Sequence, residues 1–398
     1  MQIGLVGKPS AGKSTFFKAA TLADVAIANY PFTTIKPNTG VGYVKLDCVD
    51  KEFNVQCNPR EGFCIAHKRF VPVQIIDVAG LVPDAHLGKG RGNQFLDDLR
   101  QADVLVHIID TSGSLNAFGE PVDSGSHDPA EDVKFLEVEI DMWYSGILKK
   151  GWEKFARQIQ QEHQPIQRAL AKQLSGLGVN EDMVDKLADR LKLNKEVPAS
   201  WTEEQLSMLA REFRKLTKPM IIACNKMDMP SSQKNFDRLS SQFPDYIFVP
   251  CSGDMELALR EASKHGLIEY IPGDSRFKIK DETRLSEPQK KGLASIAAYL
   301  ERHGSTGVQD LLDQAILKLL KYIAIFPGGV GKLQDQHGNY IPDCFLMPPG
   351  STALDFAYKL HTDIGKGFIR AIDVKKKLTV GKEYKLNHRD VIEIITGR

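Results

Sequence analysis

The chain has 398 residues, of which 42% are apolar and 26% charged, and its 52 Lys and Arg residues nearly balance 51 Asp and Glu residues. This composition is typical of a soluble globular protein with two or three domains. A formal net charge of +1 excludes a uniformly basic protein that coats nucleic acid, so any nucleic-acid contact must come from a local patch.

The cysteines and the apolar runs restrict the expected location. Six cysteines lie far apart in a long chain, unlike the dense framework of a small secreted domain, which favours a reducing compartment. The apolar run after Met1 is too short for a secretory signal, and no run approaches the roughly 18 residues of a membrane span. We expect a cytoplasmic protein with no membrane partner.

Two kinds of residue pattern divide the chain. Short β-rich runs predict strands at residues 3–6, 71–76, 104–109, 219–224 and 246–250, separated by glycine-bearing turns and helical stretches. This rhythm is typical of a mostly parallel α/β sheet. Residues 130–215 instead carry apolar residues at helical spacing and dense charge, which predicts a helical insertion within the α/β domain.

The C-terminal part predicts a second, smaller domain. An amphipathic helix at 306–320 closes the α/β domain, and a helix at 352–360 and a strand at 391–395 follow. We therefore predict a discontinuous α/β domain at 1–127 and 216–321, a helical insertion at 128–215, and a small α+β domain at 322–398.

A phosphate-binding loop is predicted between the first strand and the first helix. Gly7-Lys-Pro-Ser-Ala-Gly-Lys-Ser14 fits the pattern G-x-x-x-x-G-K-[ST], and a helix is expected from about Lys13. Lys13 would reach the β- and γ-phosphates, and the Ser14 hydroxyl would ligate Mg²⁺. The nucleotide-binding residues predicted here are Lys8, Pro9, Ser10, Ala11, Gly12, Lys13, Ser14 and Thr15.

Two further segments complete the predicted phosphate and magnesium site. Asp77-Val-Ala-Gly80 ends a β-branched run and matches D-x-x-G, which aims a carboxylate at Mg²⁺ and a glycine N–H at the γ-phosphate. The turn-rich stretch 28–34 suits a switch, in which Thr34, or alternatively Thr33, closes over Mg²⁺. We predict Lys13, Thr34 and Gly80 as catalytic residues, and Ser14, Thr34 and Asp77 as metal ligands.

A guanine-recognition motif follows the strand at 219–224. In Asn225-Lys-Met-Asp228, the Asp228 carboxylate can accept the N1–H and the exocyclic N–H of guanine, a pair of donors that adenine lacks. The motif stands at the carboxyl edge of the predicted sheet, where such folds bind ligands. Asn225, Lys226 and Asp228 are therefore predicted to bind the base, with Cys251, Ser252 and Gly253 forming a nearby loop.

Together these motifs resemble the Obg-like GTPases, specifically the YchF branch with its archaeal relatives. The resemblance rests on Gly7–Thr15, Tyr30–Thr34, Asp77–Val82, Gly88–Leu96 and Asn225–Asp228. Residues 346–362 and 390–396 resemble a TGS domain, a ubiquitin-like β-grasp module. The resemblance implies a P-loop G domain, an insertion and a TGS-like domain that bind Mg²⁺ and GTP or GDP and contact ribosome or structured RNA.

Two departures from the family bear on mechanism. Many YchF members lack a complete N-K-x-D motif and are associated with ATP, whereas this chain keeps Asn225, Lys226 and Asp228, so we predict GTP. Leu81 occupies the position at which Ras-type enzymes place the glutamine that orients water, so we predict slow intrinsic hydrolysis. The alternatives are a YchF-like ATPase with a stress or housekeeping role and, on the TGS-like tail alone, a synthetase-type RNA enzyme.

Three other features are candidate sites. Cys48, Cys57, Cys64 and His67 are zinc-compatible ligand types, but short paired spacings are absent, which favours buried or loosely exposed thiols.

Lys375–Lys377 and neighbouring basic residues form either a face for RNA phosphates or a solvated turn. Aromatic residues at helical spacing favour a core over a partner-binding stripe. The basic neighbours are Lys366, Arg370, Lys382, Lys385 and Arg389, and the aromatic residues are Trp143, Tyr144, Trp152 and Phe155. No DNA specificity is evident.

Overall fold

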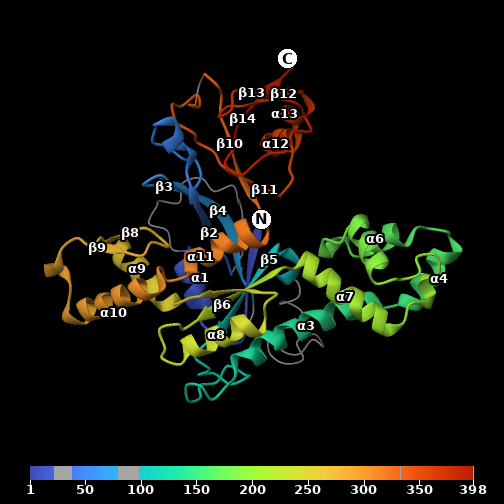
Figure 1. The fold of residues 1–398 in the computed structure, drawn as a ribbon, viewed down its shortest axis with the longest axis horizontal. Helices are drawn as coiled ribbons and strands as arrows, with labels where there is room; N and C mark the ends of the chain where they lie inside the picture. Colours follow the sequence, from blue (N-terminus) through green and yellow to red (C-terminus); the bar gives the residue numbers. More distant parts are fainter. Residues whose placement is uncertain (22–37, 79–97, 332, 398) are drawn as a thin grey trace. The chain divides into compact units, whose positions relative to one another are not determined.

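The computed structural model describes residues 1–21, 38–78, 98–331 and 333–397 (Figure 1). The chain forms two compact units, one of Met1–Ser14 with Ile76–Cys251 and the other of Thr15–Ile75 with Ser252–Arg398. The domain boundaries expected from the sequence stay predictions. No helix among the described residues combines the length and apolar character that a membrane crossing requires.

A parallel sheet forms the centre of the first unit. Strands β1 (Gln2–Val6), β5 (Val104–Asp110), β6 (Met220–Asn225) and β7 (Ile247–Pro250) lie side by side in that order, all parallel. Every residue of β5 and β6 is buried, as expected for strands of a parallel sheet that is covered on both faces. The expected α/β fold with a mostly parallel sheet is confirmed.

Most of the remaining regular structure of the first unit is helical, and the expected helical insertion is present. Its helices are α3 (Pro129–Lys149), α4 (Trp152–Gln161), α5 (Ile166–Gln173), α6 (Glu181–Arg190), α7 (Glu203–Thr217) and α8 (Ser232–Gln242). Helices α3 and α7 run side by side (Figure 1). The buried Arg214 of α7 binds Asp141 of α3 at 2.7 Å and Glu137 of α3 at 3.2 Å, which joins the two helices.

The aromatic residues of this helical segment belong to its core. Trp143, Tyr144 and Trp152 are buried, which confirms the core interpretation for these three side chains. The ring of Trp152 also stacks on that of Trp201, with centroids 5.2 Å apart.

The first part of the second unit consists of helix α1, three strands and further short strands and helices. Strands β3 and β4 pair as an antiparallel hairpin, and a 3-10 helix at Val49–Phe53 precedes them. A buried Glu256 in α9 accepts hydrogen bonds from Thr306 and Tyr270 and pairs with Arg260. These elements are α1 (Lys13–Thr21), β2 (Thr39–Asp47), β3 (Phe63–Ile65), β4 (Lys68–Asp77), α9 (Gly253–Lys264), β8 (Ile268–Tyr270), β9 (Phe277–Ile279), α10 (Glu287–His303) and α11 (Val308–Asp313). Helix α1 begins in the first unit, and β4 ends there.

A five-stranded mixed sheet ends the second unit. Its order is β11-β10-β14-β12-β13, with β10 and β14 parallel and the other pairs antiparallel. The elements are β10 (Ile323–Pro327), β11 (Phe345–Met347), α12 (Ala353–Leu360), α13 (Thr362–Lys366), β12 (Phe368–Asp373), β13 (Leu378–Val380) and β14 (Val391–Thr396). Phe356 of α12 is fully buried in the core of this sheet. This arrangement is the small α+β domain that the sequence predicts.

One carboxyl group makes the second unit sensitive to pH. Asp313, at the end of α11, accepts hydrogen bonds from the backbone N–H of Lys45 at 2.6 Å and from Gln309 Nε2 at 2.9 Å. Burial raises the pKa of Asp313 to about 7, against the opposing effect of these hydrogen bonds. The folded state therefore favours the protonated carboxyl group.

Asp313→Asn is expected to remove a pH-dependent destabilisation. Since the folded pKa is raised, the unfolded chain binds fewer protons between about pH 4 and pH 7, and stability falls as pH rises through that window. Asn keeps an accepting oxygen without ionising, so the variant should gain about 1 kcal/mol above pH 7 and little near pH 4. Thermal unfolding of both proteins across this range measures the difference. A difference in Tm that does not change with pH would contradict the assignment.

Candidate functional site

The loop between β1 and α1 requires glycine at two positions. Gly7 has φ +150°, and a Cβ there would lie 2.3 Å from the carbonyl oxygen of Ile108 in β5. Gly12 has φ +94°, and a Cβ there would lie 2.2 Å from Asn225 Nδ2. The loop therefore packs directly against the ends of β5 and β6, with its peptide groups close to the start of a helix, as anion-binding loops require.

A buried ion pair anchors this loop to the helical segment. Lys8 Nζ lies 2.7 Å from Asp132 Oδ2 of α3 and donates to the carbonyl oxygen of Leu115 at 3.0 Å. His127 Nε2 lies 2.9 Å from the other Asp132 oxygen. Burial raises the pKa of Asp132, and Lys8 opposes that shift. The Lys8 side chain is thus engaged in anchoring, and its backbone is the part that the loop offers to a ligand.

Lys13, Ser14 and Asp77 lie together at the end of the loop. Lys13 Nζ donates to the carbonyl oxygen of Lys8 at 3.0 Å, and burial lowers the pKa of Lys13 against the charge of Asp77. Ser14 Oγ donates to Asp77 Oδ2 at 3.4 Å. Burial raises the pKa of Asp77, while Lys13 and Ser14 oppose the shift. The other oxygen, Asp77 Oδ1, is buried without a hydrogen-bond partner among the described residues.

This donor set fits a magnesium ion. A hydroxyl and a carboxylate oxygen are hard ligands of the kind that Mg²⁺ prefers, and a cation would give Asp77 Oδ1 the partner that the described residues lack. The third predicted ligand, Thr34, and the predicted catalytic Gly80 lie outside the described residues, as do Leu81 and the whole 28–34 switch stretch.

The predicted guanine-recognition turn is tied to the phosphate loop. Asn225 Nδ2 donates to the carbonyl oxygen of Ala11 at 2.9 Å. The N–H of Met227 donates to Cys251 O at 3.0 Å, and the N–H of Cys251 donates to Cys224 O at 2.8 Å. These bonds bring the Asn225–Asp228 turn and Cys251 together, and Asp228 is exposed at the end of the turn.

Asp110 is a residue of this site that the sequence analysis missed. At the end of β5 it accepts hydrogen bonds from the backbone and hydroxyl groups of Ser112 and Ser114. It also pairs with Lys226 Nζ at 3.1 Å. Burial raises the pKa of Asp110, but these hydrogen bonds and Lys226 together lower it, so the carboxylate stays charged. An Asp at a strand end followed by Thr-Ser-Gly-Ser was the available signal.

The remaining predicted nucleotide residues have varied surroundings. Pro9 packs against the 115–121 loop, since a Cβ at Gly119, where φ is +81°, would lie 2.4 Å from its carbonyl oxygen. Ser10 is exposed with φ +61°. In the second unit, the N–H of Ser252 donates to Thr306 O at 2.9 Å, and Gly253 begins α9. Thr15, in the first turn of α1, also belongs to that unit.

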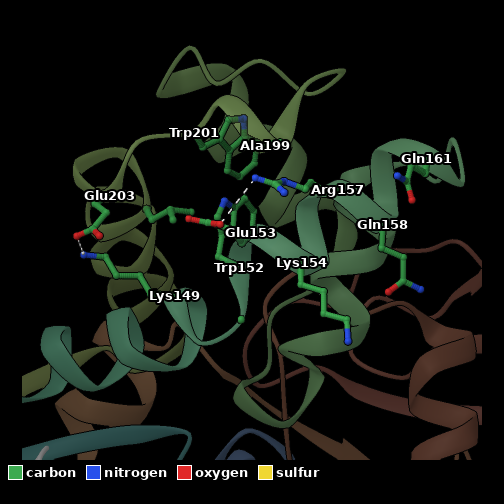
Figure 2. A pocket seen from close by; sticks show the side chains of 12 residues that line it. Lys149, Trp152, Glu153, Lys154, Arg157, Gln158, Gln161, Ala199, Trp201 and Glu203 are labelled. Carbon is green, nitrogen blue, oxygen red and sulfur yellow. Dashed lines mark hydrogen bonds and ion pairs between the residues drawn. The ribbon is translucent and has the colours of Figure 1, made fainter.

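A pocket of about 920 Å³ lies in the helical segment, away from the phosphate loop in sequence (Figure 2). The stacked rings of Trp152 and Trp201 line it. Lys149, which binds Glu203 at 3.4 Å, Lys154 and Arg157 add basic groups to its rim. Arg157 also lies 3.9 Å from Glu153, so acidic groups offset part of this positive charge, and both tryptophan rings are largely buried.

The basic face predicted near the C-terminus is partly neutralised. Lys375 binds Glu52 at 2.7 Å, Lys376 binds Asp373 at 2.7 Å, and Arg389 also binds Glu52. The members of the predicted basic set that are exposed without an ion pair among the described residues are Lys366, Arg370, Lys377, Lys382 and Lys385, of which Lys385 donates to the carbonyl oxygen of Gly350 at 2.7 Å. Lys375 and Lys376 are therefore paired within the protein. A smaller set of exposed basic side chains is left that could contact phosphate groups.

Three family models match separate parts of the chain. Residues 2–138 match the model of the 50S ribosome-binding GTPase family, residues 223–329 the Obg-like GTPase YGR210-like, G4 motif-containing domain, and residues 331–396 the TGS domain. A GTP-binding protein of Methanocaldococcus jannaschii is 49% identical over 99% of both chains. The Escherichia coli O157:H7 protein named ribosome-binding ATPase YchF is 26% identical over 92% of this chain and 86% of its own.

Solved structures agree with these relatives. The crystal structure of a GTP-binding protein from Pyrococcus horikoshii covers the whole of both chains with 40% identity and a TM-score of 0.80. The YchF GTPase of Schizosaccharomyces pombe shares the fold, with a TM-score of 0.60 and 19% identity over 99% of this chain and 97% of its own. The P-loop motif and the TGS-like C-terminus predicted from the sequence are confirmed, and the chain belongs to the Obg-like, YchF-related family of GTP-binding proteins with a C-terminal TGS domain.

Proposed function

We propose that this protein binds GTP with Mg²⁺, hydrolyses it slowly, and uses the bound nucleotide to control its association with the ribosome or structured RNA. The hydrogen bond between Asn225 Nδ2 and Ala11 O carries this proposal, because it holds the guanine-recognition turn beside the phosphate loop. A ligand bound there would meet peptide groups at its phosphates and a carboxylate at its base, which is the requirement of a guanine nucleotide.

Each residue of the turn has a separate role in this proposal. Asp228 accepts the N1–H and exocyclic N–H of guanine, while Asn225 positions the turn through Ala11. Lys226, held by Asp110 at 3.1 Å, covers the base. Because the carboxylate accepts two donors that adenine does not offer, ATP would leave a polar group unpaired.

The residues proposed to contact the phosphates and the magnesium ion also have separate roles. Ser14, Thr34 and Asp77 would hold the magnesium ion, directly or through water, and that ion would supply charge stabilisation to the β- and γ-phosphates. Lys13 exchanges its hydrogen bond to Lys8 O for phosphate oxygens when nucleotide binds. Gly80 would present its N–H to the γ-phosphate, and hydrolysis would release the switch segments Tyr30–Thr34 and Asp77–Asn93.

The names of the relatives support the ribosome association. One matching family is described as a 50S ribosome-binding GTPase, and YchF relatives are named ribosome-binding. The surfaces proposed to take part are the basic side chains Lys154 and Arg157 in the helical segment and the exposed basic set of the TGS domain. These relatives are also named ATPases, so a YchF-like ATPase without nucleotide-controlled ribosome binding is the second candidate function.

Base preference separates the two candidates. We expect GTP to bind at least about a hundredfold tighter than ATP, and Asp228→Asn to lose GTP and gain xanthosine triphosphate, since one acceptor and one donor of Asn match N1–H and O2 of xanthine. Asp245→Asn, an exposed residue away from the turn, is the matched control. Binding of xanthosine triphosphate also shows that the variant is folded. Equal affinity for ATP and GTP in the wild type would favour the ATPase.

Intrinsic hydrolysis is expected to be slow, below about 0.1 s⁻¹ for the purified protein. Leu81 offers no group that could orient the attacking water, so positioning must come from another group or from a partner. Single-turnover phosphate release with saturating Mg²⁺ measures the rate, and Lys13→Ala, prepared identically, reports contaminating activity. Turnover at about 10 s⁻¹ or faster would contradict the proposal.

Ribosome association is expected to depend on the nucleotide. Co-sedimentation with purified ribosomes should be about tenfold stronger with a non-hydrolysable GTP analogue than with GDP, a coupling of about 1.4 kcal/mol. In Asp228→Asn the GTP effect should disappear and return with a xanthine analogue. Sedimentation that is equal in every nucleotide state would point to passive RNA binding, and a response to ATP alone would support the ATPase.

A further inference from the structure

The segment from Cys48 to Arg69, called the cysteine arm below, contains little regular structure. It comprises the 3-10 helix Val49–Phe53, an irregular loop and the short hairpin strand β3. Two of its loop amides are satisfied by distant residues, since Asn58 N–H donates to Tyr340 O at 2.9 Å and Arg60 N–H donates to Pro342 O at 3.0 Å. A segment with so little helix and strand depends on such contacts and on side-chain packing to hold its shape.

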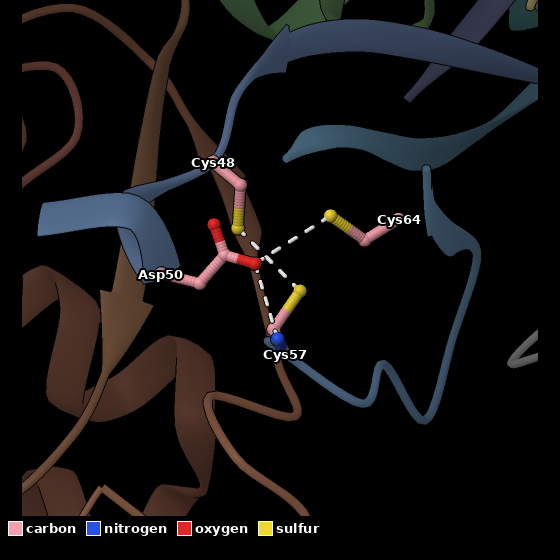
Figure 3. A group of neighbouring side chains, drawn as sticks. All are labelled: Cys48, Asp50, Cys57 and Cys64. Carbon is pink, nitrogen blue, oxygen red and sulfur yellow. Dashed lines mark hydrogen bonds between the residues drawn. The ribbon is translucent and has the colours of Figure 1, made fainter. Parts of the chain in front are cut away.

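Four potential metal ligands from separate parts of the arm converge on one point (Figure 3). Cys48 follows β2, Asp50 lies in the 3-10 helix, Cys57 in the loop and Cys64 in β3. Cys48, Asp50 and Cys57 are buried, and one ligand atom from each of the four residues lies within 4.8 Å of all the others. The side chains point toward a common centre.

Two of the distances between these ligand atoms match a tetrahedral zinc site, and the others lie within 4.8 Å. Bonds of about 2.3 Å to sulfur and 2.0 Å to oxygen place neighbouring ligand atoms roughly 3.4 to 3.8 Å apart. Cys48 Sγ lies 3.5 Å from Cys57 Sγ, and Cys64 Sγ lies 3.8 Å from Asp50 Oδ2. A disulfide would need a sulfur separation of about 2.05 Å, and all three cysteines are free thiols.

The surroundings complete a second layer around these ligands. His67 Nδ1 lies 3.0 Å from Asp50 Oδ1, and the N–H of Cys57 donates to Asp50 Oδ2 at 3.0 Å, so both oxygens of the carboxylate are oriented. The fully buried Arg69 guanidinium lies 3.6 Å from Cys57 Sγ. Three thiolates and a carboxylate around a divalent ion carry a net charge of about −2, which Arg69 partly offsets.

We propose that Cys48, Asp50, Cys57 and Cys64 bind one structural zinc ion. Three thiolates and one carboxylate fill the four positions of a tetrahedral ion, so no open position remains for a substrate. Binding releases the thiol protons to solvent and joins the 3-10 helix, the loop and β3 in one cross-link. The spacing C-x8-C-x6-C disfavoured a metal in the sequence because it lacks short pairs, and the fold supplies the proximity that the spacing does not.

The metal content of the untagged, full-length protein tests this proposal first. After dialysis against a chelator, elemental analysis should find about one zinc per chain, released in step with mercurial titration of the thiols. Cys57→Ser should lower the zinc content to near zero. Cys344→Ser, a change to a cysteine packed on the same core but outside the ligand set, should leave it unchanged.

Two further measurements separate a metal role from a packing role. His67→Gln should weaken zinc binding by about 10- to 100-fold, as loss of an outer hydrogen bond does. Cobalt(II) exchanged into the site should give the visible absorption of a tetrahedral thiolate complex, which Cys57→Ser removes. Wild-type protein that contains no zinc and takes up no cobalt would overturn the proposal. A Cys48–Cys57 disulfide in that protein, found by mass spectrometry as the loss of two hydrogens, would overturn it as well.

Discussion

The hydrogen bond from Asn225 Nδ2 to Ala11 O is the contact on which the proposed nucleotide site depends. It joins two turns that are more than two hundred residues apart in sequence, and it requires Gly12, because a Cβ there would meet the Asn225 amide at 2.2 Å. The parallel order β1-β5-β6 makes the contact possible, since the carboxyl ends of neighbouring parallel strands meet at one edge of the sheet. A phosphate loop without this partner would still bind an anion, but it would lack a fixed relation to the base.

A second constraint couples the same loop to the helical segment. The Lys8–Asp132 ion pair is almost fully buried, and removing one partner of such a pair costs roughly 3–5 kcal/mol because the other charge is left unpaired. If the loop moved away from α3, one of these charges would become exposed to solvent or would stay buried without a partner. Through α3 the constraint reaches α7, which Arg214 holds by Asp141 and Glu137. These ion pairs connect helices α3 and α7 to the loop that is proposed to bind phosphate.

The sequence predicted the parts of this structure that are encoded locally. The strands β1, β4, β5 and β6 are contiguous apolar runs, and the phosphate loop and Asn225–Asp228 turn are short motifs with fixed spacing. Contacts between distant residues could not be foreseen from local patterns. The ion pair of the Lys8 side chain with Asp132 is one example, and the pairing of Lys375 with Glu52 is another, in a run that the sequence left open between an RNA-binding face and a solvated turn. Asp110 was missed for the same reason, because its role depends on Lys226, 116 residues away.

The cysteine arm of the second unit contains two buried charged side chains, Arg69 and Asp50. Arg69 is fully buried, and its Nη1 and Nη2 donate to the carbonyl oxygens of Ile341 and Pro342, which neutralises none of its charge. Asp50 is equally buried but contacts His67 and not Arg69. Two buried groups of opposite charge that do not pair directly are costly unless a third charged group lies between them. A zinc ion held by Asp50 and three thiolates, one of them beside Arg69, would satisfy both, and its closed coordination would make the arm a structural support and not a catalytic centre.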